Sequence, residues 1–389
     1  MTASESRKAG TAINYGFLST SSPTRCGLAT FNSALAGHLD AGDGANGIVR
    51  VTLPHDDQRP GPGVVHTWQA GAHAGRREAA AALNAYDVAI VQHEFGIYPG
   101  RDGAEIVPLL RRLTVPTIVV LHTVLSNPTA SQKSLLEAIV DAASAVVTMT
   151  GTARDRLYIG YAVDAAKVSV IAHGADDHAG APVVRAARPQ LLTWGLLGPG
   201  KGIEWALRAL ALLQGLDPAP AYTVAGRTHP KVVERDGEAY RATLHRLGAT
   251  LGVGHDVTYR PEFLDARTLG GLIRSADVVV LPYDSREQVT SGVLTEAVAA
   301  GIPVVATPFP HAVELLTDGP GLLVPHRDPK KLAAAIRRIL TQPVLAAELA
   351  RRGRPLAADL SWASVAARYA QLAGTLVRSG SAPVASTTR

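Results

Sequence analysis

The feature that most constrains the fold is a repeated alternation of two kinds of segment. Short β-branched runs are followed by short Gly, His and Pro loops, and then by longer Ala-, Leu- and Arg-rich stretches with helical spacing. Strands that alternate with helices in this way favour an α/β fold with parallel sheets. Near-continuous apolar runs such as Val278–Leu281 fit strands that are covered on both faces, as strands of parallel sheets are.

The strand candidates form two series, separated by a segment of another kind. His173–Pro189 is rich in Gly, Ala, Pro and Asp and lacks periodicity, which is typical of a linker. We therefore expect two doubly wound domains that face a cleft, with ligands at the carboxyl ends of the strands. The first series is Ala12–Leu18, Ile48–Leu53, Val88–Gln92, Thr117–Leu121, Ala145–Met149 and Val168–Ile171, and the second is Leu191–Trp194, Tyr222–Ala225, Val257–Tyr259, Val278–Leu281, Val304–Ala306 and Gly321–Val324.

The predicted domain bounds follow from these series. The first domain covers residues 11–185 and the second covers residues 186–360, with flexible ends at 1–10 and 379–389. Between the second domain and the tail, apolar residues recur at helical spacing, and Ser361 is a candidate N-cap. This predicts a helix over residues 361–378, but the sequence does not indicate on which domain the helix packs.

Composition excludes several function classes. The 389 residues carry a formal charge of only +5 and no block of five Lys or Arg residues, which argues against a nucleic-acid partner. The single Cys cannot form an internal disulfide, and no apolar run approaches the length of about 20 residues that a membrane-spanning helix needs. The first ten residues contain no apolar stretch typical of a secretory signal. We expect a cytoplasmic protein, and its basic charge is compatible with peripheral contact at the inner face of the membrane.

In the first domain, candidate site residues lie where strands end. The loop Ser19–Gly27 leads into a helix, and Gly27 at the helix start would let a ligand approach backbone N–H groups. His93 and His122 each follow a strand of the same predicted sheet, without the spacing of a metal site. The alternative interpretations are an ordinary turn and two hydrogen-bonded core histidines.

In the second domain, the first strand is followed by the Gly-rich stretch Gly195–Gly202, which contains Lys201 between two glycines. Close backbone approach and a point charge at a helix entrance are what a phosphate group requires. The stretch lacks the P-loop spacing, and Lys is rare in this Arg-rich chain, which favours a functional Lys201 over an exposed turn residue. Arg227 follows the next strand and either faces phosphate or is a surface charge.

The richest segment is Pro282–Ala297. A helix is expected to begin near Gly292, so the N–H groups of Ser291, Gly292 and Val293 are predicted to be unpaired and able to hold a diphosphate. Glu296 lies one turn inside this helix, where a carboxylate can accept two ribose hydroxyls. The alternative is that Glu296 is only a favourable acid near a helix N-terminus.

Taken together, these motifs resemble retaining, nucleotide-sugar-dependent glycosyltransferases of glycosyltransferase family 4. That family carries a Glu, seven residues and a second Glu, and here Gln288 and Glu296 occupy the two positions. Its Lys-Gly pair resembles Lys201-Gly202, although Leu196 stands where Arg is usual. Its Phe-His-Thr resembles Leu121-His122-Thr123, and its Pro-His-Gly-Val resembles Ala172-His173-Gly174-Ala175.

The resemblance implies the GT-B fold, with two Rossmann-like domains, an acceptor-side domain first and a nucleotide-sugar-binding domain second. It implies that Lys201 neutralises the leaving diphosphate, Gln288 and His122 hold the transferred sugar, and Glu296 holds the donor ribose. Gly27, His93, Arg227, Ser291, Gly292 and Val293 complete the expected substrate-binding set.

The same resemblance implies retention of anomeric configuration, no metal and no cofactor beyond the nucleotide sugar. GDP-mannose and UDP-glucose are the first donors to consider, with a carbohydrate or glycolipid as acceptor. The Gln288 and Leu196 departures leave open a non-catalytic or regulatory relative that binds nucleotide sugar. A sugar-nucleotide epimerase or a phosphorylase on the same architecture is a further alternative.

Overall fold

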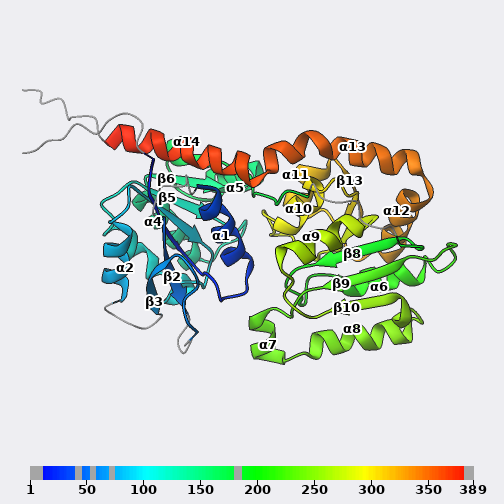
Figure 1. Cartoon of the computed structure of the whole chain (residues 1–389). Coiled ribbons are helices and arrows are strands. Elements are labelled where there is room, and N and C mark those ends of the chain that lie inside the picture. Colours follow the sequence, from blue (N-terminus) through cyan, green and yellow to red (C-terminus); the bar gives the residue numbers. More distant parts are fainter. Residues whose placement is uncertain (1–11, 40–45, 53–57, 70–74, 179–185, 381–389) are drawn as a thin grey trace, which may run out of the picture. The chain divides into compact units, whose positions relative to one another are not determined.

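The computed structural model describes residues 12–39, 46–52, 58–69, 75–178 and 186–380, and these form two compact units (Figure 1). Unit 1 contains Met1–Met149, Ala153–Ile171 and Val365–Arg389, and unit 2 contains Thr150–Thr152 and Ala172–Ser364. The chain therefore passes into unit 2 at Ala172, before the predicted domain boundary between residues 185 and 186. That boundary adjoins residues 179–185, which lie outside the described ranges, as do the predicted flexible end 1–10 and most of the predicted tail.

Unit 1 is built on a seven-stranded parallel sheet with the strand order β3-β2-β1-β4-β5-β6-β7. Its strands are β1 (Tyr15–Ser19), β2 (Gly47–Thr52), β3 (Val64–Gln69), β4 (Val88–His93), β5 (Thr117–Leu121), β6 (Ala145–Thr148) and β7 (Val168–Val170). The α-helices of this part of the chain are α1 (Gly27–Leu39), α2 (Gly75–Leu83), α3 (Ile106–Leu110), α4 (Ala130–Ala142) and α5 (Gly151–Gly160), and the short 3-10 helices are Arg101–Gly103 and Ala165–Lys167.

Two differences from the sequence prediction have simple causes. The strand β3 was missed because it lies at the edge of the sheet and is only partly buried, so its sequence VVHTWQ includes polar residues among the apolar ones. The strand β1 begins at Tyr15, whereas the prediction began it at Ala12. Ahead of Tyr15, the backbone and side-chain nitrogens of Asn14 both donate to Asp87, which holds this segment outside the ladder.

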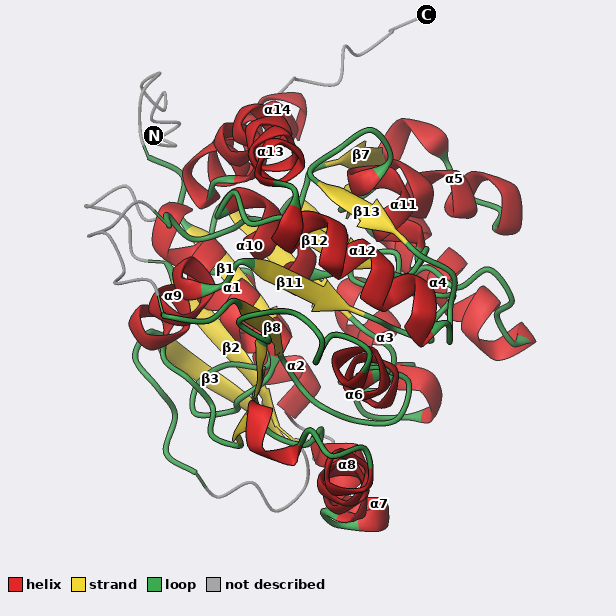
Figure 2. Ribbon diagram, turned by 90° about the vertical axis from the view of Figure 1, so that its right-hand side faces the viewer, coloured by secondary structure: helices red, strands yellow, loops and turns green. Residues whose placement is uncertain are grey.

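Unit 2 is built on a six-stranded parallel sheet with the order β10-β9-β8-β11-β12-β13, and β8 lies beside β11 (Figure 2). Its strands are β8 (Gln190–Trp194), β9 (Ala221–Ala225), β10 (Val257–Arg260), β11 (Val278–Leu281), β12 (Val304–Ala306) and β13 (Gly321–Leu323). The helices that follow are α6 (Ile203–Ala211), α7 (Pro230–Asp236), α8 (Ala239–Thr250), the 3-10 helix Gly254–Asp256, α9 (Ala266–Ser275), α10 (Gly292–Ala299), α11 (Pro310–Leu316), α12 (Pro329–Thr341), α13 (Pro343–Leu360) and α14 (Trp362–Gly380).

The continuous apolar run of β11 is explained by two separate core clusters, one on each face of this sheet. Val278 and Val280 pack into a cluster with α6, α8 and α12, whereas Val279 and Leu281 pack into a cluster with α9, α10 and α11. Alternate side chains of a strand point to opposite faces, so a strand covered on both sides has no position for a polar residue. The predicted fold class, α/β with two doubly wound sheets, is confirmed.

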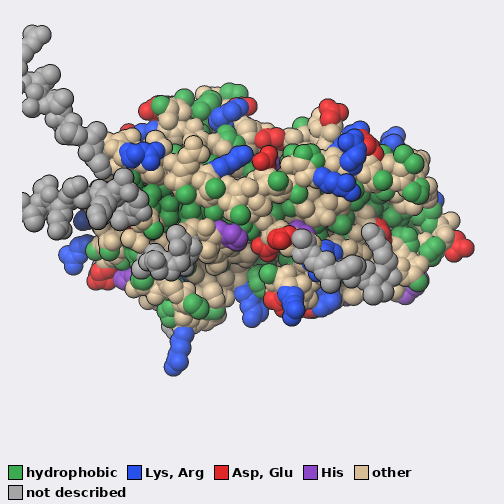
Figure 3. All heavy atoms as spheres, turned by 45° about the horizontal axis from the view of Figure 1, so that its top comes forward, with side chains coloured by type: hydrophobic (Ala, Val, Ile, Leu, Met, Phe, Trp, Pro, Cys, Tyr) green, Lys and Arg blue, Asp and Glu red, His purple; other side chains and the backbone are tan. Residues whose placement is uncertain are grey.

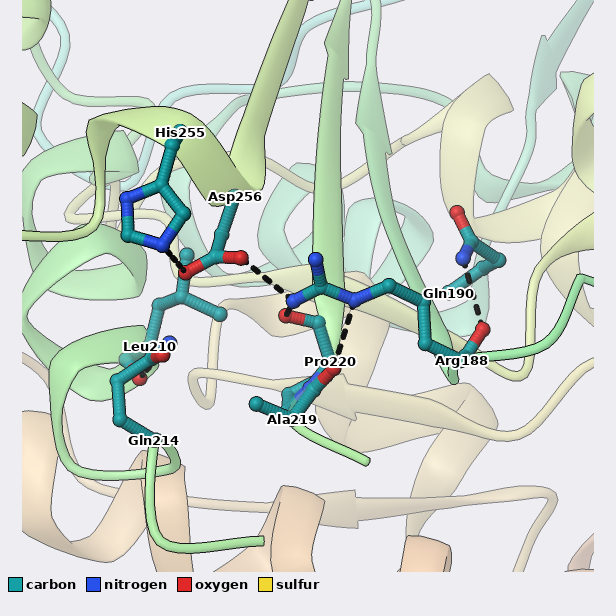
Figure 4. Close-up of polar contacts among 8 residues, drawn as sticks. All are labelled: Arg188, Gln190, Leu210, Gln214, Ala219, Pro220, His255 and Asp256. Atoms are coloured by element: carbon teal, nitrogen blue, oxygen red, sulfur yellow. Dashed lines mark hydrogen bonds and ion pairs between the residues drawn. The ribbon is translucent and has the colours of Figure 1, made fainter. Parts of the chain in front are cut away.

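The amino end of the second sheet is fastened by Arg188, just before β8 (Figure 4). Its guanidinium donates to the carbonyl oxygens of Ala219 and Pro220 at 2.8 and 2.9 Å, and to a carboxylate oxygen of Asp256 at 2.6 Å. Asp256 is only 3% exposed, and His255 contacts its other oxygen at 3.2 Å. This cluster joins the approaches to β8, β9 and β10 at the end of the sheet opposite to the strand exits.

The final helix, predicted over residues 361–378, is α14. The Ser361 hydroxyl accepts a hydrogen bond from the Ser364 N–H at 3.2 Å, as the N-cap prediction requires. Val365 and Tyr369 are fully buried, and α14 belongs to unit 1 from Val365 onward, which answers the question that the sequence left open. None of the helices in the described ranges is both long enough and apolar enough to cross a membrane.

Charged side chains of both signs are interspersed on the face drawn in Figure 3. Several basic residues are paired with acidic neighbours on the same helix. Glu348 of α13, for example, accepts from Arg351 at 2.8 Å and from Arg352 at 2.9 Å. Pairing of this kind leaves the net charge of the chain at +5 but offsets individual basic side chains locally. The predicted absence of a nucleic-acid partner and the predicted contact with a membrane surface remain predictions.

Candidate functional site

The strand order of unit 2 reverses between β8 and β11, and ligands of open α/β sheets bind beside such a reversal, outside the carboxyl ends of the strands. The loops that leave these two neighbouring strands are Gly195–Gly202, after β8, and Pro282–Ser291, after β11. Topology therefore brings together the two segments that the sequence singled out.

Backbone hydrogen bonds hold the Gly-rich loop between its neighbours. The Asp284 N–H donates to the Gly200 carbonyl at 2.9 Å, which ties the loop to the exit of β11. On the other side, the Leu197 N–H donates to the Arg227 carbonyl and the His229 N–H donates to the Leu197 carbonyl, both at 2.8 Å. The Gly-rich loop is thus fixed at both sides.

Lys201 is half-buried, and its ammonium lies over the ring of Tyr283, 4.1 Å from the ring centroid. Burial lowers the pKa of Lys201 to about 8. Among the described residues, no carboxylate forms an ion pair with this ammonium. A half-buried cation without an acidic partner, in a Gly-rich loop at a strand exit, is suited to bind an anionic ligand.

Tyr283 was missed by sequence reasoning, although it is the second residue after the end of β11. Its ring is fully buried and stacks on Phe309 with the ring centroids 5.0 Å apart. Its carbonyl oxygen accepts from the Thr307 hydroxyl and lies 2.8 Å from Nδ1 of His326. The ring that faces Lys201 is therefore rigidly held, and the only sequence signal for it was an aromatic residue at a strand exit.

The prediction for the N-terminus of α10 needs one correction. The Ser291 N–H is not unpaired: it donates to Nδ1 of His311 at 2.8 Å, and the Ser291 hydroxyl caps the helix by accepting from the Leu294 N–H at 3.2 Å. His311 lies twenty residues further along the chain, so sequence spacing could not indicate this bond. In the described part of the chain, the N–H groups of Gly292 and Val293 have no hydrogen-bond acceptor.

Gly292 and Val293, at the start of α10, also pack closely against residues of neighbouring loops. A Cβ atom on Gly292 would lie 2.8 Å from Nε2 of His173, so a larger residue here would displace this half-buried imidazole. A Cβ atom on Gly195, at the start of the Gly-rich loop, would lie 3.3 Å from a methyl group of Val293. The helix N-terminus and the Gly-rich loop are therefore neighbours.

The side chains of Gln288 and Arg227 make fewer contacts with described residues than the side chain of Lys201 does. The Gln288 carbonyl accepts from the His311 N–H at 3.3 Å, and no described residue bonds to its half-buried amide side chain. The Arg227 side chain is exposed, while the Arg227 carbonyl holds the Gly-rich loop. Of these two cations, Lys201 is therefore the more buried one.

Glu296, in the second turn of α10, is 18% exposed at its side chain, and burial raises its carboxyl pKa. The Asp176 N–H donates to both carboxylate oxygens, at 3.1 and 3.3 Å, and Nε2 of His178 lies 2.5 Å from Oε2. Glu296 is thus more than a helix-terminal acid, because one other segment of unit 2, which carries Asp176 and His178, holds its carboxylate in place.

Unit 1 has its own reversal of strand order, between β1 and β4, and the predicted histidines lie at the strand exits beside it. Nε2 of His122 lies 2.8 Å from Oε1 of Gln92, and because an amide oxygen only accepts, the imidazole donates this bond. The Gln92 amide donates in turn to Oδ1 of Asn32 at 3.4 Å, and Phe31 packs edge-on against the His122 ring. His122 is therefore oriented by its neighbours.

His93 is fully buried, and its burial lowers its pKa to about 4, so it is neutral near pH 7. Neither ring nitrogen has a hydrogen-bond partner among the described residues. Gly27, by contrast, is exposed, and a Cβ atom there would have no heavy atom within 4 Å. Glu94, which sequence reasoning did not select, accepts from the Thr123 hydroxyl at 2.6 Å beside these residues.

The match to a known protein family lies within the second unit. Residues 188–342 match the family described as "Glycosyl transferases group 1". Glycogen synthase of Mycobacterium tuberculosis is 31% identical over 240 residues, which is 60% of this chain and 55% of that protein. A GDP-mannose-dependent phosphatidylinositol monomannoside mannosyltransferase of Mycolicibacterium smegmatis is 31% identical over 192 residues, covering 48% and 47% of the two chains. The chain thus spans about half of the length of these relatives.

Solved structures resemble nearly the whole chain. A sucrose-phosphate synthase of Thermosynechococcus elongatus aligns with a TM-score of 0.73 and 21% identity, covering 94% of this chain and all of that one. HepE of Anabaena, solved in complex with UDP and glucose, aligns with a TM-score of 0.71 and 16% identity over 93% of this chain and all of that one. These likenesses confirm the two-domain Rossmann-like architecture, the GT-B fold.

Proposed function

We propose that the chain is a glycosyltransferase that moves a sugar from a nucleoside-diphosphate sugar to a carbohydrate or glycolipid acceptor, with retention of anomeric configuration and without a metal ion. The observation that carries the proposal is Lys201: a half-buried ammonium without a carboxylate partner among the described residues, in a Gly-rich loop at the reversal of strand order. The family match over residues 188–342 supports the same conclusion.

The chemistry assigns a role to each residue of unit 2. Cleavage of the anomeric C–O bond leaves negative charge on the diphosphate, which Lys201 and the free N–H groups of Gly292 and Val293 would stabilise. Positive charge develops on the sugar, whose hydroxyls the Gln288 amide would bind. Glu296 would accept hydrogen bonds from the ribose. Residues 186–360 would then be the donor-side domain.

In unit 1, His122 is the residue that we propose to contact the transferred sugar, because the bond to Gln92 fixes its ring. His93 and Gly27 are proposed as further substrate-binding positions, and residues 11–185 as the acceptor-side domain. GDP-mannose and UDP-glucose remain the first donors to test. The mannosyltransferase relative is named as GDP-mannose-dependent, and HepE was solved with UDP and glucose.

The direct test is to incubate the protein with GDP-mannose or UDP-glucose, with and without candidate acceptors, and to measure release of the nucleoside diphosphate. Release that depends on acceptor, with a product whose anomeric configuration by NMR equals that of the donor, supports the proposal. Nucleotide binding without release would favour a non-catalytic relative. An inverted product would contradict retention.

Glu296→Ala is expected to weaken binding of the free nucleoside diphosphate by about 1–3 kcal/mol, the range for loss of a charged hydrogen-bond partner. Isothermal calorimetry on the folded variant measures this difference. Glu348→Ala removes a carboxylate from the surface of the same unit and should leave the affinity unchanged. Equal affinities of wild type and Glu296→Ala would remove Glu296 from the site.

A further inference from the structure

His178 of unit 2 contacts the Glu296 carboxylate and has no role in the mechanism proposed above. His178 is the last residue of the described range 75–178, and its side chain is 6% exposed. Its Nε2 atom is 2.5 Å from Oε2 of Glu296. A carboxylate oxygen at the pH where it is ionised only accepts, so the imidazole donates its proton into this short bond.

The segment that carries His178 is itself fixed. The Ala175 N–H donates to the Leu360 carbonyl at 2.7 Å, and the Trp362 N–H donates to the Ala175 carbonyl at 3.1 Å. Gly174 lies against the Trp362 indole so closely that a Cβ atom would come within 2.2 Å of the ring. These contacts hold the backbone around Ala175 in place. The hydrogen bonds from Asp176 and His178 therefore restrict the orientation of the Glu296 carboxylate.

The other nitrogen of His178 indicates that packing alone does not explain the residue. Nδ1 is buried without a hydrogen-bond partner among the described residues, on the side of Gly270 in α9. Leaving a buried polar atom unpaired is unfavourable, and an apolar side chain of similar size would avoid that cost. The bond from Nε2 to Glu296 is therefore the contact that accounts for an imidazole at this position.

We propose that His178 is a positioning residue that orients the Glu296 carboxylate to accept the two ribose hydroxyls of the donor nucleotide. This inference rests on the proposed function, in which Glu296 binds ribose. A carboxylate has about four lone-pair positions. The Asp176 N–H is shared between the two oxygens and the His178 N–H binds Oε2, which leaves acceptor capacity for the ribose hydroxyls mainly at Oε1. A carboxylate already held in the binding orientation loses less conformational freedom when the nucleotide binds.

The test compares ligands that differ only in ribose. His178→Ala is titrated calorimetrically with the nucleoside diphosphate that binds the wild type, with its 2′-deoxy form and with inorganic pyrophosphate. We expect an affinity loss of about tenfold for the nucleoside diphosphate, corresponding to loss of one charge-assisted hydrogen bond. The 2′-deoxy form should lose clearly less, and pyrophosphate should be unaffected. His178→Gln, whose amide can donate to Glu296, should recover part of the affinity.

Two further variants make the result decisive. His178→Leu fills the same space but cannot donate, and it replaces His178→Ala if that variant does not fold. His255→Ala removes the imidazole of another His–carboxylate pair of the same unit, drawn in Figure 4 beside Asp256, and should leave all three affinities unchanged.

An equal loss for the nucleoside diphosphate and its 2′-deoxy form, or no loss for either, overturns the positioning role. Failure of the proposed function would look different, because the wild type itself would then bind neither nucleoside diphosphate nor pyrophosphate.

Discussion

Lys201→Ala is expected to lower sugar transfer at saturating donor by about 10²–10³, the effect of removing one preorganised electrostatic group. The charge on the leaving diphosphate grows as the glycosidic bond breaks, so a cation beside it stabilises the transition state more than the ground state. With Leu196 in place of a second cation and the Arg227 side chain exposed, few charges share this task. Donor affinity should therefore fall less than turnover.

The control for this variant is Lys231→Ala, which removes the same charge from an exposed position in α7 of the same unit. Its turnover should stay within about twofold of wild type, as expected for an exposed charge. Equal rates in Lys201→Ala and wild type would contradict the assignment.

The pH dependence of the reaction is an independent test of Lys201, because burial lowers the pKa of Lys201 to about 8. In the free enzyme this group loses its charge as the pH rises through that value, so kcat/KM should fall above pH 8.

Gly202→Ala is expected to be the most damaging single-methyl change near the site. Gly202 has φ of 66°, and a Cβ atom there would lie 1.8 Å from the carbonyl oxygen of Pro282. The left-handed backbone costs about 1–2 kcal/mol for a residue with a Cβ atom. The collision adds a further cost of about 1–3 kcal/mol, because the exit of β11 must move. Since that exit also carries Tyr283, nucleotide binding should be lost as well.

Gly301→Ala separates the two contributions. Gly301 has nearly the same φ, 69°, but no heavy atom lies within 4 Å of the Cβ position. Urea denaturation should therefore show a smaller loss of unfolding free energy for Gly301→Ala than for Gly202→Ala, and nucleotide binding should persist. Equal losses for both variants would contradict a steric role for the contact between Gly202 and the Pro282 carbonyl.

The fold could be predicted where the burial of an element produces a clear pattern of apolar residues along the sequence. Val278–Leu281 is apolar throughout because both faces of β11 are covered, and the sequence pattern reports this directly. The strand β3 has one open edge and partial burial, so Val64–Gln69 mixes polar and apolar residues and gave no comparable signal. Patterns along the chain also did not indicate which unit α14 belongs to, because an apolar stripe does not identify its partner.

The site could be predicted where chemistry is local in sequence. Lys201 stands between two glycines after a strand, and this pattern, together with the rarity of Lys in an Arg-rich chain, led to the prediction of a phosphate-binding loop. Contacts between distant segments were beyond this reasoning: His178 and Glu296 are 118 positions apart, and the bond from Ser291 to His311 removed an N–H group that was predicted to be unpaired. Tyr283 was not selected either, because nothing in the sequence links its ring to Lys201, 82 positions away.

The central claim is that unit 2 binds a nucleoside diphosphate through its phosphate groups. Calorimetric titration of the wild type with GDP and guanosine, and with UDP and uridine, tests this claim most directly. We expect one of the two diphosphates to bind at least about 100-fold more tightly than its nucleoside, a difference of about 2.7 kcal/mol, and inorganic pyrophosphate to compete with it. Equal affinity for nucleoside and diphosphate, or no binding of either diphosphate, would contradict the account.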